Sequence, residues 1–220
     1  MINFIKHRIW SYIFSGVFVL ASILSLSVWG LKLGIDFTGG SLLEVNFVQS
    51  RPTNADLEAT LAPLNLGNIV IQPAADSDII LRFRDITEAE HQNILQSIRT
   101  VHGDVTEMRF ETVGPTLGAE MGRRAMWAVG VALALIIVYI AWAFRKVARP
   151  VASWKYGLTA IIALAHNTII TVGIFSLLGH FVGVEVDSLF VSALLTLLGF
   201  SVHDTIVVYD RTRENLFKQG

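Results

Sequence analysis

The sequence predicts an α-helical membrane protein with four spans and an α+β domain inserted between the first two. Hydrophobic residues make up 53% of the 220 residues, charged residues only 16%, and the mean hydropathy is +0.56. Such values are typical of membrane proteins rather than soluble domains. The charges also fall in blocks that leave four long apolar segments between them. A net charge of −1 gives no general attraction for nucleic acid, so we expect no nucleic-acid partner.

Each apolar segment is long enough to cross the hydrocarbon core, which takes about 20 residues in a helix. We expect spans at residues 9–31, 125–144, 156–178 and 188–209. The first segment differs from a secretory signal peptide because it is too long and no small-x-small cleavage site follows it. We therefore expect it to be a retained span.

Lys and Arg residues in the short flanking segments predict the orientation. They occur in residues 1–8, 145–155 and 210–220, whereas the loop 179–187 has none. We therefore expect both termini and the 145–155 loop in the cytoplasm, and residues 32–124 and 179–187 on the opposite side.

Residues 32–124 show the pattern of a small α+β domain. Strand-like segments lie at 42–48, 68–73, 78–83 and 105–113, and helical segments at 53–62 and 87–103. The order β-α-β-β-α-β is that of the ferredoxin-like fold. We expect this domain to bind or to transmit force rather than to catalyse a reaction.

Local signals define the second helix of this domain and the strand after it. Thr87 and Glu90 have the spacing of a capping box. The residues expected to form one buried stripe are Ile94, Leu95, Ile98 and Val101. Alternation in the last strand places Met108 and Phe110 on one face. His91 and His102 stand alone in the pattern, and we expect both to be solvated.

The residues give little support to an enzyme. Cysteine is absent, which excludes disulfides, thiolate metal sites and a catalytic thiol. An HExxH zinc signature is missing, and the spans contain a single acid, Asp204, where an aspartyl protease needs two. A serine protease could combine Ser201 with His166 or His203, but neighbourhood in sequence says little about geometry. We expect neither an enzymatic activity nor a cofactor.

The segment GIDFTGGS, residues 34–41, follows the first span. Its junction residues are Gly34, Asp36, Phe37, Thr38, Gly39 and Gly40. Glycine permits positive φ and close backbone approach, and Asp and Thr can satisfy free backbone groups in turns. Two interpretations remain open: a tight capped turn, or a hinge or close interdomain contact at Gly39 and Gly40.

Asp204 is the only acid inside a span, and an ionisable group there is a functional hypothesis by default because burial in lipid is costly. The alternative is that Asp204, six residues before Asp210, meets water at the helix end. Ser201 precedes Asp204 by one turn and could donate to it, whereas His203 points about 100° away. His166 and Asn167 lie mid-span and could bond across helices, line a wet path or simply pack.

Four segments in order resemble one known family. They are GIDFTGG before a strand, VGPTLGAE at 113–120, ALAHNTIITVGIFSLLG at 163–179, and VDSLFVSALLTLLGFSVHDTIVVYDRTREN at 186–215. Together they are similar to the SecF side of the SecD/SecF protein-export membrane proteins, within the RND superfamily. The resemblance covers nearly the whole chain.

The resemblance implies a multispan protein of the bacterial inner membrane, with residues 32–124 in the periplasm. Its implied partners are SecD, the Sec protein-conducting channel, the translocating unfolded polypeptide and the lipid bilayer. Proton flow would drive motion of the periplasmic domain late in translocation, and the acid matching Asp204 would take part in proton passage. The other rival functions are an RND-type small-molecule transporter subunit and a passive membrane scaffold.

The chain departs from the family pattern at three places. The family has His-Asp where this chain has His166-Asn167, and Asn-Asp where it has His203-Asp204. An amide cannot carry a proton as a carboxylate does, whereas His203 could titrate near neutral pH if wet. The family also has six spans where four are expected here, which leaves a shortened sequence or a contribution from a partner as alternatives.

Overall fold

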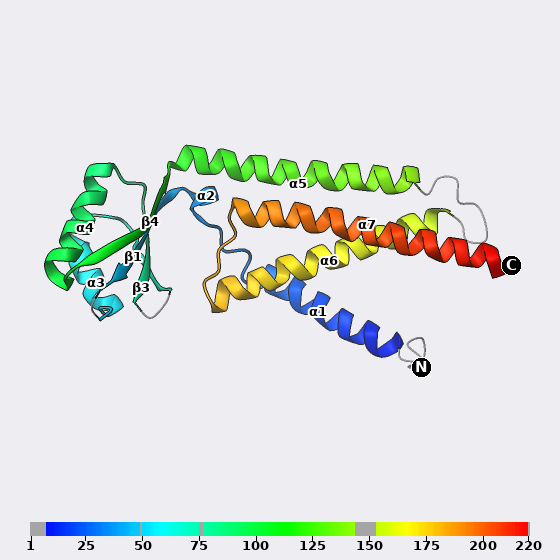
Figure 1. Cartoon of the computed structure of the whole chain (residues 1–220), viewed down its shortest axis with the longest axis horizontal. Coiled ribbons are helices and arrows are strands. Elements are labelled where there is room, and N and C mark those ends of the chain that lie inside the picture. Colours follow the sequence, from blue (N-terminus) through cyan, green and yellow to red (C-terminus); the bar gives the residue numbers. More distant parts are fainter. Residues whose placement is uncertain (1–7, 49, 75–76, 144–152, 220) are drawn as a thin grey trace. The chain divides into compact units, whose positions relative to one another are not determined.

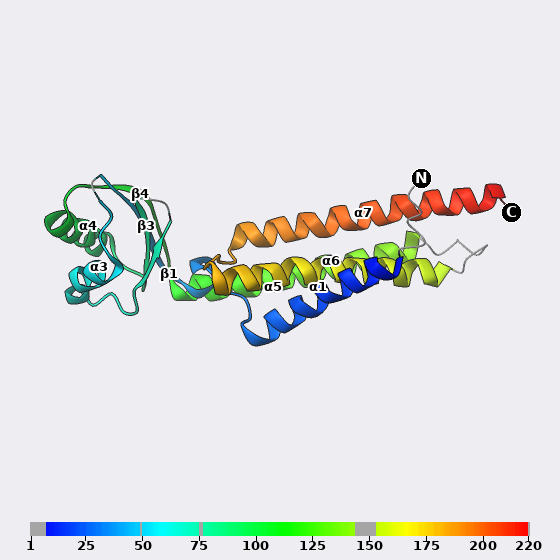
Figure 2. The ribbon, with the colours of Figure 1, turned by 90° about the horizontal axis from the view of Figure 1, so that it is seen from below.

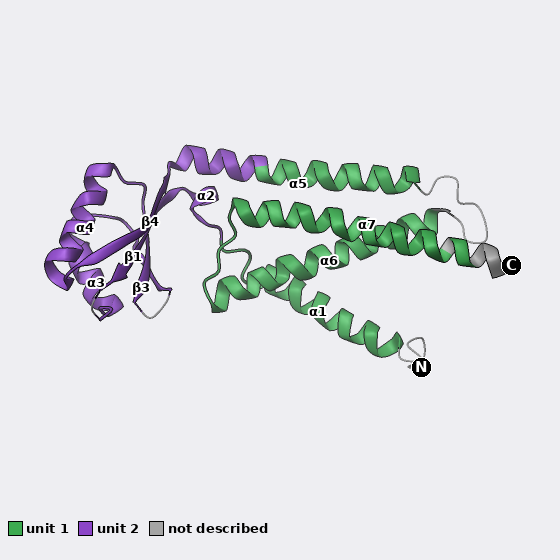
Figure 3. Ribbon diagram, viewed as in Figure 1, with its two compact units in different colours: residues 1–32, 125–220 green, residues 33–124 purple. Residues whose placement is uncertain are grey.

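The computed structural model describes residues 8–48, 50–74, 77–143 and 153–219. The chain forms two compact units (Figure 3). One contains Met1–Lys32 and Ala125–Gly220, and the other contains Leu33–Arg124. We call them the helical unit and the outer unit.

The helical unit holds the apolar helices (Figure 1). They are α1 (Arg8–Val28), α6 (Ser153–Phe181), α7 (Ser188–Gln219) and the part of α5 (Pro115–Ala143) that begins at Ala125. Four helical segments of the described chain are long and apolar enough to cross a membrane: Arg8–Val28, Pro115–Ala143, Trp154–Phe181 and Ser188–Thr212. The expected cytoplasmic loop 145–155 lies outside the described residues up to position 152, and positions 153–155 are helical.

Two helices extend well past the expected span limits. Helix α5 starts at Pro115, ten residues before position 125, and proline suits the first helical position because its missing N–H has no partner there. Helix α7 continues to Gln219 instead of ending near 209. An ion pair between Arg211 and Glu214, three residues apart at 2.5 Å, supports the first of these extra polar turns.

Helices α1 and α6 pack against each other from Ser15 to the end of α1 and diverge towards its start (Figure 1). Their contacts join residues at a constant separation of 151 positions, as the two hydrogen-bonded pairs show. The pairs are Ser15 with His166, Ser22 with Gly173, Ser25 with Ser176, and Trp29 with His180. A constant separation means parallel helices in register, and steps of seven and three along α1 are those of a coiled-coil seam. We call these four pairs the α1–α6 seam.

The seam is close because its members are small. A Cβ atom added at Gly173 would lie 2.5 Å from the Cα of Ser22, so the two backbones touch where the glycine sits. Ser22 and Ser25 are both buried. Small residues of this kind allow helix backbones to approach in membranes, where packing and interhelical hydrogen bonds drive association.

An apolar cluster joins α5, α6 and α7 within the same unit. Its buried members are Ile140, Tyr156, Ala160, Leu164, Leu198 and Val202. Tyr156 of α6 also meets the edge of the Tyr209 ring of α7, with ring centroids 5.5 Å apart. The cluster fixes α6 against α7 at the level of the polar residues described below.

The outer unit contains a four-stranded antiparallel sheet with two helices on one face (Figures 1 and 2). Its elements are α2 (Ile35–Thr38), β1 (Gly40–Phe47), α3 (Asn54–Leu61), the 3₁₀ turn η2 (Ala62–Leu64), β2 (Val70–Pro73), β3 (Asp78–Phe83), α4 (Glu88–His102) and β4 (Val105–Val113). The strand order is β2-β3-β1-β4. From β1 onward the elements follow the expected succession of strands and helices.

The core of the outer unit comes from one face of the sheet and the facing sides of α3 and α4. Leu43 pairs with Leu81 and Val45 with Ile79 across β1 and β3, and all four are fully buried. These residues alternate along each strand, as expected for a sheet with one covered face. The core fixes the start of β1 and the end of β4, which pair with each other next to the junction residues.

Two details of the expected core are wrong. Val101, assigned to the buried stripe of α4, lies in the last turn of that helix and is 62% exposed, whereas Ile94, Leu95 and Ile98 are buried. The pairing of β1 with β4 shifts register between Glu44 and Val45. The shift leaves Met108 as an extra residue in β4, so strict alternation fails there and Met108 is exposed.

The expectation of a solvated His91 is also wrong. Its ring is 3% exposed, stacks on Phe110 with centroids 3.8 Å apart, and has Glu88 at 3.2 Å and Glu107 at 3.4 Å. His102 is half-buried, and its Nε2 atom is 2.8 Å from the hydroxyl oxygen of Thr60, which ties α4 to α3. Both rings face other elements of the fold rather than the solvent.

The capping box at the start of α4 is present as expected. The Thr87 side chain accepts from the Glu90 backbone N–H, and the Glu90 carboxylate accepts from the Thr87 backbone N–H at 2.8 Å. Arg84 donates to the same carboxylate at 2.5 Å. The hydrogen bond from Arg84, with those from Thr87, lowers the pKa of Glu90 to about 2.

This pKa predicts a stability change in acid. A carboxyl group with a lowered folded-state pKa stabilises the fold above its unfolded pKa, near 4.3, and loses that contribution as the pH falls towards 2. We expect the outer unit to lose pepsin resistance over this window, and Glu90→Gln, which can still cap the helix, to reduce that loss.

Glu58→Gln is the matched control, because Glu58 is an exposed acid on α3. The pepsin resistance of this variant should equal that of the unchanged chain at every pH. Equal losses in Glu90→Gln and the unchanged chain would contradict the assignment of this acid sensitivity to Glu90.

Candidate functional site

The junction residues form a tight turn capped by hydrogen bonds. The carbonyl of Gly34 accepts from the backbone N–H groups of Phe37 and Thr38, both at 3.1 Å, and from the Thr38 hydroxyl at 3.0 Å. The backbone N–H of Gly39 donates to Ile35 at 2.9 Å. These bonds close the four-residue helix α2 immediately before β1.

Gly39 and Gly40 both have positive φ, at 72° and 120°, and both are in close contact with backbone. A Cβ at Gly39 would lie 2.7 Å from the Cα of Pro115, and one at Gly40 would lie 2.8 Å from the carbonyl oxygen of Phe83. Only glycine meets both demands without strain.

The contact at Gly39 is reciprocal. A Cβ at Gly118, in the first turn of α5, would lie 2.6 Å from the backbone nitrogen of Gly39. The segments 34–41 and 113–120, which the sequence singled out separately, therefore meet backbone to backbone. Of the two interpretations, the turn is present, and the close contact lies within the outer unit.

The other junction residues lie around this turn. Phe37 is half-buried, and its ring is within reach of a Cβ placed at Gly122, at 3.8 Å. Asp36 is half-buried in the first turn of α2. The contacts of Phe37 extend the junction one further turn along α5.

Three expected pathway residues form a hydrogen-bond network between α6 and α7. The Asn167 amide N–H donates to the Ser201 hydroxyl oxygen at 2.9 Å. His166 Nδ1 lies 3.0 Å from Asn167 Oδ1, and because an amide oxygen only accepts, the ring nitrogen is the donor. His166 and Asn167 thus bond across helices, one of the alternatives that the sequence left open.

The network continues to α1 through a residue that the sequence did not indicate. The Ser15 hydroxyl lies 2.6 Å from His166 Nε2. Ser15, Ser22 and Ser25 have the spacing of residues in a helix–helix seam, and this spacing could have indicated Ser15. The three serines lie in an otherwise apolar span, where the pattern is weak. We call Ser15, His166, Asn167 and Ser201 the polar network.

Asp204 and His203 lie outside this network. Both side chains are exposed on the surface of α7 in the single chain. Among the described residues no hydrogen bond joins Ser201 to Asp204, although Ser201 is one turn away on the same helix. The expected donation from Ser201 to Asp204 is therefore not present, and the Ser201 oxygen accepts from Asn167 instead.

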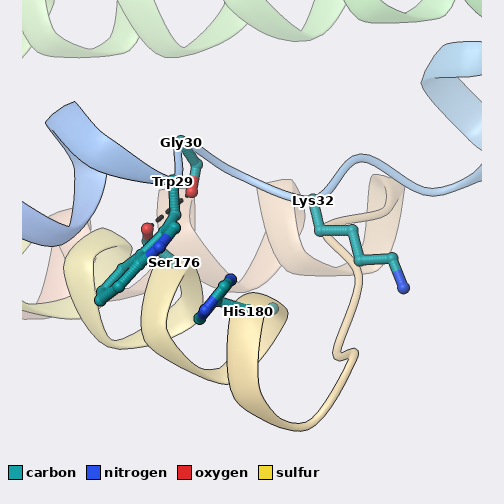
Figure 4. A pocket seen from close by; sticks show the side chains of 6 residues that line it. Trp29, Gly30, Lys32, Ser176 and His180 are labelled. Carbon is teal, nitrogen blue, oxygen red and sulfur yellow. Dashed lines mark hydrogen bonds between the residues drawn. The ribbon is translucent and has the colours of Figure 1, made fainter.

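A small cavity lies at the end of the α1–α6 seam (Figure 4). Its volume is about 320 Å³, and it is lined by Trp29, Gly30, Lys32, Ser176, Gly179 and His180. Trp29 stacks on His180 with ring centroids 4.4 Å apart, and Ser176 donates to the Gly30 carbonyl at 2.6 Å. Lys32 points away from this stack and pairs with Glu185 at 3.5 Å. These contacts close the seam where α1 ends.

Two protein-family models match this chain, one over the segment that contains α6 and α7 and one over the segment that contains the junction residues. The model of the C-terminal part of the SecD/SecF protein export membrane proteins matches residues 93–220, which include α6 and α7. The model of the SecD/SecF GG motif matches residues 25–50, which include the junction.

Curated relatives match over the whole chain. The protein translocase subunit SecF of Thermobaculum terrenum is 37% identical over all of this chain and 72% of its own length. That of Anaerolinea thermophila is 36% identical over 98% of this chain and 70% of its own.

A solved structure has the same fold. The crystal structure of SecDF, a translocon-associated membrane protein from Thermus thermophilus, matches with a TM-score of 0.78 and 27% identity over 97% of this chain. The chain spans 28% of the length of that SecDF chain. Family models, relatives and structure agree: the chain belongs to the SecF family of SecD/SecF protein export membrane proteins.

Proposed function

We propose that this chain couples proton flow to the late stage of protein export, in the bacterial inner membrane and beside SecD and the Sec channel. The observation that carries the proposal is the polar network between α1, α6 and α7, one helical turn from Asp204, the only acid within the span limits expected from the sequence. Polar groups at this depth are costly and mark functional paths. A passive anchor has no need of them.

The proton step takes place at the Asp204 carboxyl. The group is neutral when it holds a proton and can then face an apolar environment, whereas its anion requires water or a cationic partner. One elementary charge moved across the membrane potential is worth about 2.3 kcal/mol per 100 mV. Uptake on one side and release on the other would supply this energy to a conformational change.

Asn167 limits what the network itself can do. Its amide donates and accepts but does not exchange a proton readily, so it breaks any direct relay from His166 to Ser201. The network therefore holds α6 in a fixed position against α7, and the proton is carried by the Asp204 carboxyl group and by water. Because Asp204 is exposed in the single chain, SecD would cover it and complete the path.

The outer unit would carry the motion. Its βαββαβ succession and strand order β2-β3-β1-β4 support a ferredoxin-like domain, placed in the periplasm with both chain termini in the cytoplasm. Helix α5 is continuous from Pro115 to Ala143, so a shift of its membrane part reaches Gly118 without a flexible linker. At Gly118 it meets Gly39, and the outer unit follows and acts on the exported polypeptide.

Replacement of Asp204 by Asn tests the proton step. The amide has nearly the same shape but cannot ionise. We expect the stimulation of export by the proton-motive force to fall to the level of vesicles that lack the protein, while assembly with SecD is unchanged. The measurement is translocation of a labelled secretory protein into inverted vesicles with and without an uncoupler.

Asp210→Asn is the control, since Asp210 lies on the same helix six residues later. It should retain the stimulation. If Asp204→Asn kept full uncoupler-sensitive stimulation, the chain would be a passive scaffold.

The contact of Gly118 with Gly39 is testable by adding one methyl group. Alanine normally favours a helix over glycine by about 1 kcal/mol, but at Gly118 its Cβ would meet the Gly39 backbone. We expect Gly118→Ala to destabilise the outer unit by about 1–3 kcal/mol and to reduce export stimulation. Chemical denaturation of the full chain and the same vesicle assay measure the two effects.

Gly130→Ala, also on α5, is the matched control because nothing lies within 4 Å of a Cβ there. It should leave both measurements at or slightly above their original values. Equal behaviour of the two variants would show that the junction does not depend on a side-chain-free position 118.

A further inference from the structure

We infer that Ser15 of α1 is a positioning residue that selects the tautomer of His166 and thereby the direction of the polar network. The inference rests on the proposed function only where it concerns export. The hydrogen-bond geometry stands independently of it.

The described bonds define a direction across three helices. Asn167 Oδ1 accepts from His166 Nδ1, so the neutral ring carries its proton on Nδ1 and leaves Nε2 as an acceptor. Ser15 is 2.6 Å from Nε2 and is the donor that this tautomer requires. Donation then runs from Ser15 through His166 and Asn167 to the oxygen of Ser201.

The opposite tautomer disrupts this order. With the proton on Nε2, the lone pair of Nδ1 would face Asn167 Oδ1, and two acceptors would stand 3.0 Å apart. The amide would have to turn over, and the Ser201 hydroxyl would then donate to Asn167 Oδ1 instead of accepting, so the direction of each bond would reverse. The hydrogen bond that one ring nitrogen makes sets whether the other nitrogen carries the proton. We assign this role to the bond between Ser15 and Nε2.

The orientation of the Ser15 hydroxyl is not the default for a helical serine. Ser27 on the same helix donates to the carbonyl of Ile23, four residues back, at 2.8 Å. Ser15 instead lies across the interface against His166. Its height along α6 is fixed by the α1–α6 seam, in which Ser22 touches Gly173 one heptad further on.

Nitrogen NMR of the full chain in lipid bilayers tests the inference. The protein is labelled with ¹⁵N-histidine and measured at about pH 9, where unperturbed imidazoles are neutral. His166→Gln identifies the His166 signals by their loss. We expect the proton on Nδ1 in the unchanged chain, and loss of at least half of that signal to the Nε2–H form in Ser15→Ala.

Two further variants separate positioning from packing. Ser15→Thr keeps the hydroxyl and should restore the Nδ1–H signal, and Ser27→Ala removes a hydroxyl that does not touch the ring and should leave it unchanged. An Nε2–H ring in the unchanged chain, an unaltered signal in Ser15→Ala, or failure of Ser15→Thr to restore it would each overturn the inference.

The export assay then separates this inference from the proposed function. Ser15→Ala should lower uncoupler-sensitive stimulation several-fold, and Ser15→Thr should recover it. If the tautomer changes in Ser15→Ala while stimulation stays complete, Ser15 still positions His166, and the proposed part of the polar network in proton coupling is wrong.

Discussion

The contact between Ser22 and Gly173 is the constraint on which the helical unit depends. Water does not drive two apolar helices together inside a bilayer, so their association rests on close packing and on hydrogen bonds between polar groups. At Gly173 the backbones touch, and this sets α1 and α6 parallel and in register. The register places Ser15 opposite His166 and Ser25 opposite Ser176. A one-residue slip would leave these hydroxyls facing lipid.

The outer unit uses the same device at a second place. Gly39 and Gly118 permit two backbones to meet where β1 begins and α5 begins. In both cases a glycine permits the contact because it has no side chain, and an added Cβ would clash with backbone atoms of the neighbouring segment. The family models that match residues 25–50 and 93–220 therefore correspond to two parts that touch in space.

Much of this architecture could be predicted because local physics dominates it. The capping box of Thr87 and Glu90 and the four long apolar helices follow from short-range patterns. The expected site residues His166, Asn167 and Ser201 do come together.

What could not be predicted depends on partners distant in the chain. The burial of His91 needs Phe110 and Glu107 of another strand, and the exposure of Met108 follows from a register shift. The spacing of Ser15 from Ser22 and Ser25 is the signal that the sequence holds for Ser15, and it does not show that the partner lies 151 residues away. Asp204 stood out from sequence alone as the one acid of the spans, yet no described contact within this chain holds it.

Disulfide formation between α1 and α6 tests the register most directly. The chain has no cysteine, and the hydroxyl oxygens of Ser25 and Ser176 are 2.8 Å apart, so S25C with S176C brings two sulfur atoms into bonding range. Ser27 is two residues along and exposed, so S27C with S176C is the out-of-register control. Mild oxidation of full-length protein in membranes should cross-link the first pair and leave the second free. Equal cross-linking of both pairs, or cross-linking of the second alone, would contradict the register on which the polar network depends.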